Sequence, residues 1–189
     1  MRMSYYYKKY EKVWDMERIL SSMEFYNFRK AETSEIEEIY HLIEKRINWM
    51  DKNNINQWNK TNYLDSYPRD YFKSKIEEGQ LFVMYNELTG KVVGAVVLLE
   101  EDKRWYKDGS KNYYIHNLVS DTKVPGVGTK ILNLCEQMAL DNSVDAIRLD
   151  CEASNIKLNA FYEGLGYCYV GDVQEGSYIG HKREKKLRN

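Results

Sequence analysis

Two glycines stand one residue apart in the stretch KVPGVGTKIL, immediately before a segment whose apolar residues have helical spacing. A helix that follows a strand presents unpaired backbone N–H groups at its first turn, and the helix dipole adds partial positive charge there. Because Gly126 and Gly128 lack a Cβ, a bulky anion can come close to that backbone. The stretch therefore predicts a diphosphate-binding turn, and a tight strand-to-helix turn is the plain structural alternative.

The two common nucleotide-binding motifs do not fit this stretch. The pattern GxxxxGK[ST] is absent, and position 131 is Ile where the dinucleotide fingerprint needs its third glycine. Lys123 and Lys130 flank the glycines and would add positive charge at the rim. A phosphate-bearing ligand at this turn would therefore need a site of another kind.

A second motif, SNIKLNAFYEGLGY, follows the next predicted strand, and its Asn155 precedes Tyr162 by seven residues. The chain thus has, in order, a strand, the glycine turn, a helix, a second strand and the helix from Asn155 to Tyr162. This order resembles that of the GNAT superfamily of acyl-CoA-dependent N-acetyltransferases, and the resemblance covers about residues 25–183. The turn is similar to that family's Gln/Arg-x-x-Gly-x-Gly/Ala loop, with Lys at 123 and Val at 124 as departures. The family's later motif, Asn-x-x-Ala-x-x-aromatic/Leu-Tyr-x-x-x-Gly-aromatic, is matched at Asn155, Phe161, Tyr162, Gly166 and Tyr167, with Leu158 where a small residue is usual.

The resemblance implies acetyl-CoA as co-substrate and direct transfer of its acetyl group to a primary amine of a small molecule or a protein. In the family, the strand before the loop has a bulge whose free backbone groups bind the pantetheine arm and the thioester oxygen. Tyr162 matches the general acid that protonates the departing thiolate, with a core tyrosine as the alternative, and Asn155 would bind the cofactor or cap its own helix. The residues expected to bind the cofactor are Leu118 and Val119 on the bulge, Lys123, Val124 and Gly126 in the loop, Val127, Gly128, Thr129 and Lys130 through their backbone N–H groups, Asn155 and Tyr162.

A general base would take a proton from the ammonium form of the acceptor. His116 lies in the strand segment nearest the expected thioester, and histidine titrates in a suitable range. A buried histidine bonded to backbone is the structural alternative. Asp150 and Glu152, at the end of the next strand, are rival bases or anchors for a cation, and a water relay would need no single base.

The acceptor would enter over the polar segment of residues 51–67, which joins the first two predicted helices. Gln57, Trp58 and Tyr63 are the candidate substrate-binding residues there, since an aromatic ring attracts an amine cation. Trp58 is equally well explained as a packing residue that pins the loop. A non-catalytic CoA-binding or sensory module of the same fold is the alternative to an enzyme.

The remaining patterns place these residues in one α/β domain over residues 24–189. Apolar alternation, helical spacing and turn residues predict a mixed sheet with helices on both faces, and the family resemblance makes this sheet mostly antiparallel. Ser34 and Glu37 have capping-box spacing at the start of the first helix, and Pro68 and Gly79 bound the second. The predicted strands are residues 24–32, 80–87, 91–101, 113–120, 144–152, 167–173 and 177–186, and the predicted helices are residues 33–50, 68–79, 128–142 and 154–166.

Composition narrows the function classes. The 189 residues carry a net charge of −1 with both signs interspersed, which lacks the basic field that nucleic-acid binding needs. The three cysteines, at positions 135, 151 and 168, form no CxxC pair and are expected to be buried thiols rather than metal ligands. No signal-peptide or membrane-spanning run is present, so we expect a cytoplasmic protein without a membrane partner.

Residues 1–23, basic and aromatic and then helical, form a predicted N-terminal extension that would pack on the domain or on a second subunit of a homodimer.

Overall fold

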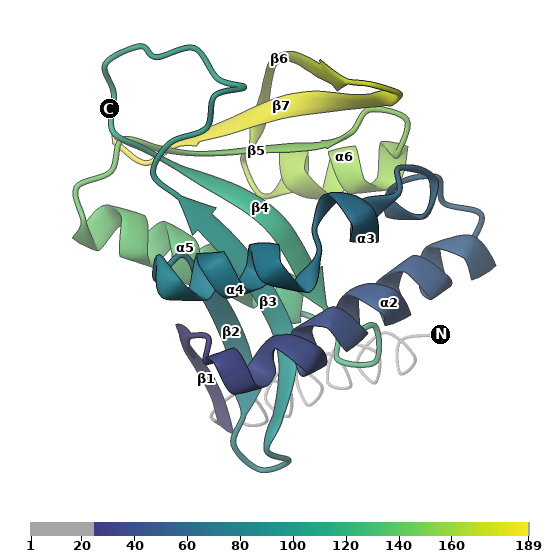
Figure 1. Ribbon diagram of the computed structural model, residues 1–189. Coiled ribbons are helices and arrows are strands. Elements are labelled where there is room, and N and C mark those ends of the chain that lie inside the picture. The colour runs from purple at the N-terminus through teal and green to yellow at the C-terminus, as the bar shows by residue number, and fades with distance from the viewer. Residues whose placement is uncertain (1–24, 189) are drawn as a thin grey trace, which may run out of the picture.

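The computed structural model of the protein describes residues 25–188, so the extension predicted for residues 1–23 lies outside the described residues. A seven-stranded sheet in the order β1-β2-β3-β4-β5-β7-β6 forms the centre (Figure 1). The strands are β1 (Tyr26–Lys30), β2 (Leu81–Asn86), β3 (Lys91–Leu99), β4 (Asn112–Ser120), β5 (Ala146–Glu152), β6 (Cys168–Glu175) and β7 (Tyr178–Lys186). The helices are η2 (Thr33–Glu35), α2 (Ile36–Lys52), η3 (Trp58–Lys60), α3 (Tyr63–Ser66), α4 (Arg69–Glu77), α5 (Val127–Asp141) and α6 (Ile156–Gly164).

Neighbouring strands run antiparallel except for β4 and β5, which run parallel and are joined through α5. A parallel pair needs such a crossover connection. Of the antiparallel pairs, β2–β3, β3–β4 and β6–β7 are consecutive in the chain, whereas helices separate β1 from β2 and α6 and β6 separate β5 from β7. The prediction of a mixed, mostly antiparallel sheet is confirmed.

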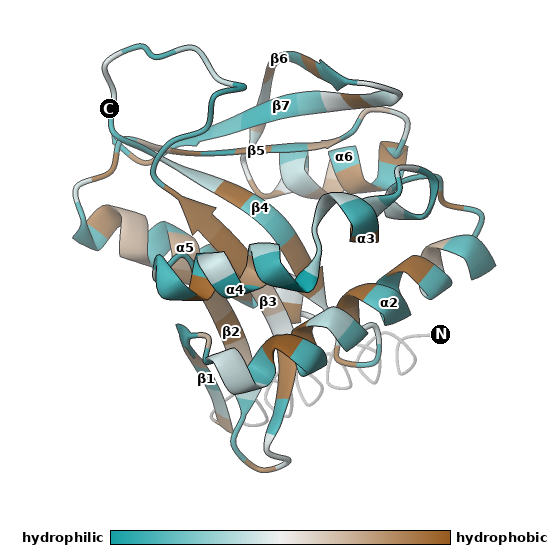
Figure 2. Cartoon of the chain, viewed as in Figure 1, coloured by the Kyte–Doolittle hydropathy of each residue, from teal (hydrophilic) through white to brown (hydrophobic). Residues whose placement is uncertain are grey.

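Helices cover both faces of the sheet. Helices α2 and α4 pack on one face, and α5 and α6 pack on the other (Figure 1). Figure 2 shows why the two layers form: the central strands are apolar along much of their length, while α2 and α4 carry apolar residues in stripes. Strands buried on both faces read as continuous apolar runs, and β3, with seven consecutive buried residues, has this pattern.

The start of α2 differs from its predicted form. The 3₁₀ turn η2 precedes the helix, and the Glu35 carboxylate accepts a hydrogen bond of 2.8 Å from the backbone N–H of Glu32. Arg29 of β1 holds the same carboxylate with two hydrogen bonds of 2.8 and 2.9 Å. The predicted capping box of Ser34 and Glu37 is therefore wrong, because the ion pair with β1 selects Glu35 and shifts the cap by two residues.

The segment predicted as a loop, residues 51–67, contains the two short helical turns η3 and α3. Trp58 stacks on Tyr63 with ring centroids 4.3 Å apart, and Tyr63 meets Tyr67 at 4.7 Å. The chain turns at Asn62, whose φ of 47° is a left-handed value that asparagine tolerates better than most residues. The aromatic stack therefore gives this segment a defined shape over the end of β4.

Gly94 sets the distance between α5 and the sheet. A Cβ at this position would lie 2.7 Å from Ile131 Cδ1, 2.9 Å from Val127 Cγ1 and 3.1 Å from the carbonyl oxygen of Val119. Only a residue without a side chain allows the first turns of α5 to pack directly over β3 and β4.

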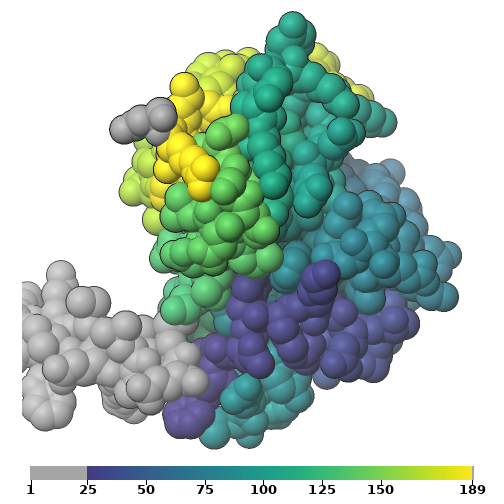
Figure 3. All heavy atoms as spheres, turned by 90° about the vertical axis from the view of Figure 1, so that its left-hand side faces the viewer, coloured from purple at the N-terminus to yellow at the C-terminus, as the bar shows by residue number. Residues whose placement is uncertain are grey.

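A long loop, residues 100–111, joins β3 to β4 and projects beyond the sheet (Figures 1 and 3). Its backbone is fixed at Arg104, whose carbonyl oxygen accepts a hydrogen bond from Lys182 of β7. Further along, Asp108 pairs with the buried side chain of Arg148 on β5. These contacts hold one stretch of the loop against the sheet rather than in solvent.

Candidate functional site

Strands β4 and β5 separate halfway along their length. They pair only from Asn112 opposite Ala146 to Ile115 opposite Leu149. Beyond that point β4 stays with β3, and the end of β5 stays with β7. A wedge-shaped opening between two adjacent strands is the result.

A bulge in β4 begins where the opening begins. Asn117 and Leu118 together lie opposite one residue of β3, Val96, because the register shifts between Ala95 and Val97. Asn117 has φ of 51°, and its side chain accepts from the Tyr71 hydroxyl at 3.0 Å and donates to the Tyr63 hydroxyl at 2.5 Å. The tyrosines of α3 and α4 thus hold the bulge in place.

The ladder between β3 and β4 decides which backbone groups face the opening. Asp121 N–H donates to Val93 at 2.8 Å, and alternate residues of an antiparallel strand point their N–H and C=O groups to the same side. Val119 therefore uses its backbone groups toward β3, and its side chain is buried. The backbone groups of Leu118 and Ser120 therefore point into the opening. Of the two predicted residues, Leu118 and Val119, only Leu118 is placed for backbone contact with a ligand there.

The first turn of α5 lies at one end of the opening. Gly126 caps the helix in a left-handed conformation, with φ of 85°, which a residue with a side chain adopts only under strain. The first hydrogen bond of the helix runs from Lys130 N–H to the Gly126 carbonyl at 3.0 Å. Among the described residues, the N–H groups of Val127, Gly128 and Thr129 have no partner.

Two of the loop predictions are refined by this geometry. The N–H of Lys130 was expected to meet a diphosphate, but the helix already uses it, so Lys130 has only its side chain to offer. A Cβ at Gly128 would meet nothing closer than the Ser120 hydroxyl oxygen, at 3.6 Å. The protein itself therefore has room for a Cβ at Gly128, so packing does not require a glycine at this position.

A cavity of about 710 Å³ occupies the opening and runs beneath η3 and α3. It is lined by these predicted residues: Gln57, Trp58, Tyr63, His116, Leu118, Gly128, Asp150, Asn155 and Tyr162. Val119, Lys123, Val124, Gly126, Val127, Thr129, Lys130 and Glu152 are not part of its lining. Glu152 instead faces a smaller depression of about 210 Å³ and accepts from the Ser154 hydroxyl at 3.0 Å, so it lies away from the other candidate bases.

Tyr162 reaches the cavity from α6. Its ring is buried and packs edge-on against Phe161 and Tyr167, with centroids 5.3 and 5.9 Å away. Burial, with the nearby Cys151 and Asp150, raises the pKa of the Tyr162 hydroxyl well above its ordinary value. The residue therefore carries its proton at neutral pH, as a proton donor must.

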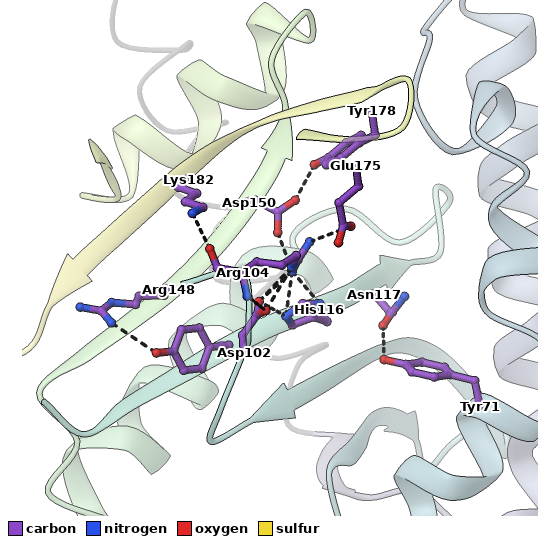
Figure 4. Close-up of polar contacts among 11 residues, drawn as sticks. Tyr71, Asp102, Arg104, His116, Asn117, Arg148, Asp150, Glu175, Tyr178 and Lys182 are labelled. Atoms are coloured by element: carbon purple, nitrogen blue, oxygen red, sulfur yellow. Dashed lines mark hydrogen bonds and ion pairs between the residues drawn. The ribbon is translucent and has the colours of Figure 1, made fainter. Parts of the chain in front are cut away.

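His116 belongs to a network of charged groups on the cavity wall (Figure 4). Its Nε2 lies 2.9 Å from Asp102 Oδ2, and Arg104 Nη2 lies 3.1 and 3.0 Å from the two ring nitrogens. Burial disfavours the charge on Asp102, but hydrogen bonds from His116 and Arg104 outweigh it and hold the pKa of Asp102 well below its usual range. The alternative of a histidine bonded to backbone does not hold, because its partners are side chains.

Asp150 occupies the other side of the same network. Its Oδ1 lies 2.9 Å from Arg104 Nη2, and its Oδ2 accepts from the Tyr178 hydroxyl at 2.5 Å. Glu175 completes the group at 3.8 Å from Arg104 Nη1 and is half exposed. With a guanidinium and a hydroxyl on its two oxygens, Asp150 is better suited to orient Arg104 than to accept a proton.

Asn155 caps α6, because its Oδ1 accepts from Leu158 N–H at 3.1 Å. Its Nδ2 donates to Gln57 Oε1, also at 3.1 Å, and so joins α6 to the segment before η3. Trp58 and Tyr63 form the stacked pair of that wall. Of the two readings of Asn155, helix capping is the one that its hydrogen bonds show.

Several residues of the cavity were missed by sequence reasoning. Arg104 lines the cavity and Asp102 supports it from behind, and both lie in a polar loop with no motif, where nothing local indicates that the loop folds over β4. Asn117 offered a signal, since an asparagine inside an apolar strand run marks a left-handed residue or a bulge. Arg46 of α2 is a further lining residue that belongs to no motif in the sequence.

Among residues 25–188, no group of three or more His, Cys, Asp or Glu side chains has the arrangement of a metal site. Within the same part of the chain, none of the helices has the length and apolar character of a membrane span. The buried thiols, Cys135 and Cys151, are part of the core, whereas Cys168 is exposed and departs from the expectation of three buried cysteines.

Comparisons with known proteins agree with this geometry. The curated "Uncharacterized N-acetyltransferase YesJ" of Bacillus subtilis (strain 168) is 28% identical over 155 residues, which cover 77% of this chain and 83% of the relative. A GNAT family acetyltransferase of Listeria monocytogenes 4b F2365 has a TM-score of 0.69 at 22% identity, covering 85% of this chain and 94% of that one. The PaiA N-acetyltransferase of Thermoplasma acidophilum, solved in complex with coenzyme A, has a TM-score of 0.64 at 15% identity, covering 85% and 98%. A sequence model of the acetyltransferase (GNAT) family matches residues 43–167, and the chain belongs to this family.

Proposed function

We propose that the protein is an N-acetyltransferase that moves the acetyl group of acetyl-CoA to a primary amine of a small molecule or a protein. The observation that carries the proposal is the wedge between β4 and β5, with unpartnered N–H groups at the start of α5 on one side and Tyr162 on the other. Family membership and the coenzyme A complex of the T. acidophilum relative support the choice of acyl donor.

Three N–H groups at the first turn of α5 suit the diphosphate of the donor, because they point outward together with the positive end of the helix dipole. The backbone groups of Leu118 and the N–H of Ser120 suit the pantetheine arm, whereas the Ser120 carbonyl already accepts from Arg46. An N–H from Leu118 aimed at the thioester oxygen would stabilise the negative charge that develops there during attack. Holding donor and acceptor together supplies a large part of the rate enhancement by itself.

Tyr162 is the proposed proton donor. As the amine nitrogen bonds to the thioester carbon and the carbon–sulfur bond breaks, the Tyr162 hydroxyl would give its proton to the departing sulfur. Its raised pKa keeps the hydroxyl protonated until that step. Its position on α6 is fixed by the hydrogen bonds of Asn155 and Asn159 at the start of the same helix.

His116 is the proposed base, since it lines the cavity on the bulged strand. Asp102 is bonded to His116 Nε2 and would balance the positive charge gained when the ring accepts a proton. Asp150 is engaged by Arg104 and Tyr178, and Glu152 lies outside the cavity, so both are weaker candidates.

A direct assay tests the proposal. Purified protein is incubated with acetyl-CoA and a panel of amines, and release of free thiol is followed with a thiol-reactive dye. We expect thiol release that depends on one class of amine and an acetylated product detected by mass spectrometry. Binding of coenzyme A without thiol release for any amine would favour the alternative, a non-catalytic CoA-binding or sensory module. Absence of coenzyme A binding would overturn both.

A further inference from the structure

Arg46 reaches from α2 across the open end of β4. Its Nη2 donates to the carbonyl oxygen of Ser120 at 2.6 Å and contacts the Ser120 hydroxyl at 3.1 Å. The side chain is partly buried and lines the same cavity as Gly128. The guanidinium therefore lies where α2, the end of β4 and the cavity meet.

The Ser120 hydroxyl relates Arg46 to the start of α5. This oxygen lies 3.1 Å from Arg46 Nη2 and 3.6 Å from the position that a Cβ on Gly128 would occupy. The guanidinium thus contacts a hydroxyl group that lies beside the space left open by the missing side chain of Gly128. A ligand atom seated over Gly128 would be close to the cation.

Within the described residues the charge of Arg46 is compensated only by the Trp49 ring, whose centroid lies 5.2 Å from its Cζ, and by the oxygens of Ser120. No carboxylate there lies within salt-bridge distance of it, whereas Arg104, on the opposite wall, faces Asp102, Asp150 and Glu175. Burial lowers the pKa of the Arg46 guanidinium, and the more distant charge of Asp121 offsets this only in part. A desolvated cation of this kind gains from an anion placed in the cavity.

The hydrogen-bonding capacity of Arg46 is also largely unused. A guanidinium has five N–H donors in a planar fork that matches phosphate oxygens, and only Nη2 has a partner among residues 25–188. Nearby, the N–H groups of Val127, Gly128 and Thr129 are unpartnered as well. These donors come from two separate elements, and of the residues that carry them Arg46 and Gly128 line the same cavity.

We infer that Arg46 binds the diphosphate of the acyl donor, as a side-chain clamp from α2 opposite the backbone donors of α5. The inference rests on the proposed function, because it assumes a CoA-type donor, and it adds a residue outside the glycine loop and outside every motif in the sequence. It assigns α2 a binding role beyond covering the sheet.

The test compares coenzyme A with dephospho-coenzyme A, which lacks only the 3′-phosphate, and acetyl-CoA with acetyl-pantetheine, which lacks the whole adenosine diphosphate part. Arg46→Gln removes the charge, and Lys45→Gln is the matched control, since it removes one charge from an exposed neighbour on the same helix. Affinities for coenzyme A and dephospho-coenzyme A are measured by calorimetry. Values of kcat/KM are measured with acetyl-CoA and with acetyl-pantetheine, which lacks the diphosphate.

We expect Arg46→Gln to weaken binding of coenzyme A and of dephospho-coenzyme A by about 10- to 100-fold, the range for losing hydrogen bonds to a charged group. The kcat/KM for acetyl-CoA falls by a similar factor, while that for acetyl-pantetheine changes less than about threefold. Lys45→Gln leaves all four values near those of the wild type. Arg46→Lys, which keeps the charge but not the fork, gives an intermediate loss and serves if the glutamine variant does not fold.

Three results would overturn the inference. Unchanged affinity of Arg46→Gln for coenzyme A would show that the side chain does not bind the donor. An equal loss with acetyl-pantetheine would assign Arg46 a structural role at the end of β4. A loss that disappears with dephospho-coenzyme A would assign it to the 3′-phosphate instead. Failure of the wild type to bind coenzyme A is a separate outcome, because it contradicts the proposed function itself.

Discussion

Gly94→Ala tests whether close packing of α5 on the sheet creates the site. The added Cβ would stand 2.7 Å from Ile131 Cδ1 and 2.9 Å from Val127 Cγ1, both on α5. It would also stand 3.1 Å from the carbonyl oxygen of Val119, which belongs to the bulged strand. The end of the Ile131 side chain can move, but Val127 Cγ1 is attached next to the helix backbone, so the first turn of α5 has to lift; the Val119 carbonyl adds a clash that only a shift of β4 relieves.

The expected size of the effect follows from these contacts. Forcing one extra methyl group into a packed interior costs about 1–3 kcal/mol. In a chain of this length each kcal/mol lowers the melting temperature by roughly 2–4 °C. Because Val127 carries one of the free N–H groups, lifting it also misplaces the first turn, and we expect coenzyme A to bind about tenfold more weakly, equivalent to about 1.4 kcal/mol.

Urea denaturation and calorimetry measure the two effects separately. Gly128→Ala is the control for stability, because its Cβ would meet only the Ser120 hydroxyl at 3.6 Å and alanine is favoured over glycine in a helix by up to about 1 kcal/mol. We expect that variant to be as stable as the wild type or more so. A free energy of unfolding for Gly94→Ala within about 0.5 kcal/mol of the wild type would refute the packing argument.

The other predictions concern the chemistry and its pH dependence. Tyr162→Phe is expected to lower kcat by about 10²–10⁴-fold with little change in coenzyme A affinity, and full turnover would remove the acid assignment. Gly128→Val should abolish coenzyme A binding in calorimetry while the fold persists, and an unchanged affinity would contradict the diphosphate site. His116→Ala should flatten the acidic limb of the pH–rate profile, and an unaltered limb would point to Asp150, Glu152 or water. The pKa of Asp102 is lowered in the folded state, so its charge stabilises the fold at pH values above its unfolded-state pKa of about 3.9, and this stabilisation is lost as the pH falls below that value. The difference in unfolding free energy between wild type and Asp102→Asn should therefore be larger at pH 7 than at pH 3. A difference that does not change with pH would refute the ion-pair account.

The features predicted well from sequence are those encoded within a short stretch. Gly126 needs a left-handed backbone, and the helix after it begins one residue later, so the turn is local. Asn155 and Tyr162 share one helix whose register follows from its own spacing. The family resemblance then supplied the order in which these stretches meet across the sheet.

Features that depend on distant partners were not predictable in the same way. Glu35 rather than Glu37 stabilises the start of α2 because Arg29 lies on the adjacent strand, a pairing that no local pattern shows. The N–H of Lys130 looked free in sequence, yet the first hydrogen bond of the helix uses it once Gly126 sets the cap. In both cases the sequence allows more than one capping arrangement, and only the three-dimensional structure shows which one forms.

The charged groups around Arg104 were also not predictable from the sequence. Three carboxylates, from Asp102, Asp150 and Glu175, converge on Arg104 from a loop, a strand end and a hairpin, and the sequence separations are too large for any motif. Arg104 contacts both candidate bases, and what distinguishes them is the other partner: Asp150 accepts from the Tyr178 hydroxyl, whereas His116 faces the carboxylate of Asp102, which could balance a gained proton. If His116 is the base as proposed, the 100–111 loop helps to select it, and we expect Arg104→Gln to shift the acidic limb of the pH–rate profile; an unchanged limb would show that the loop does not influence the base.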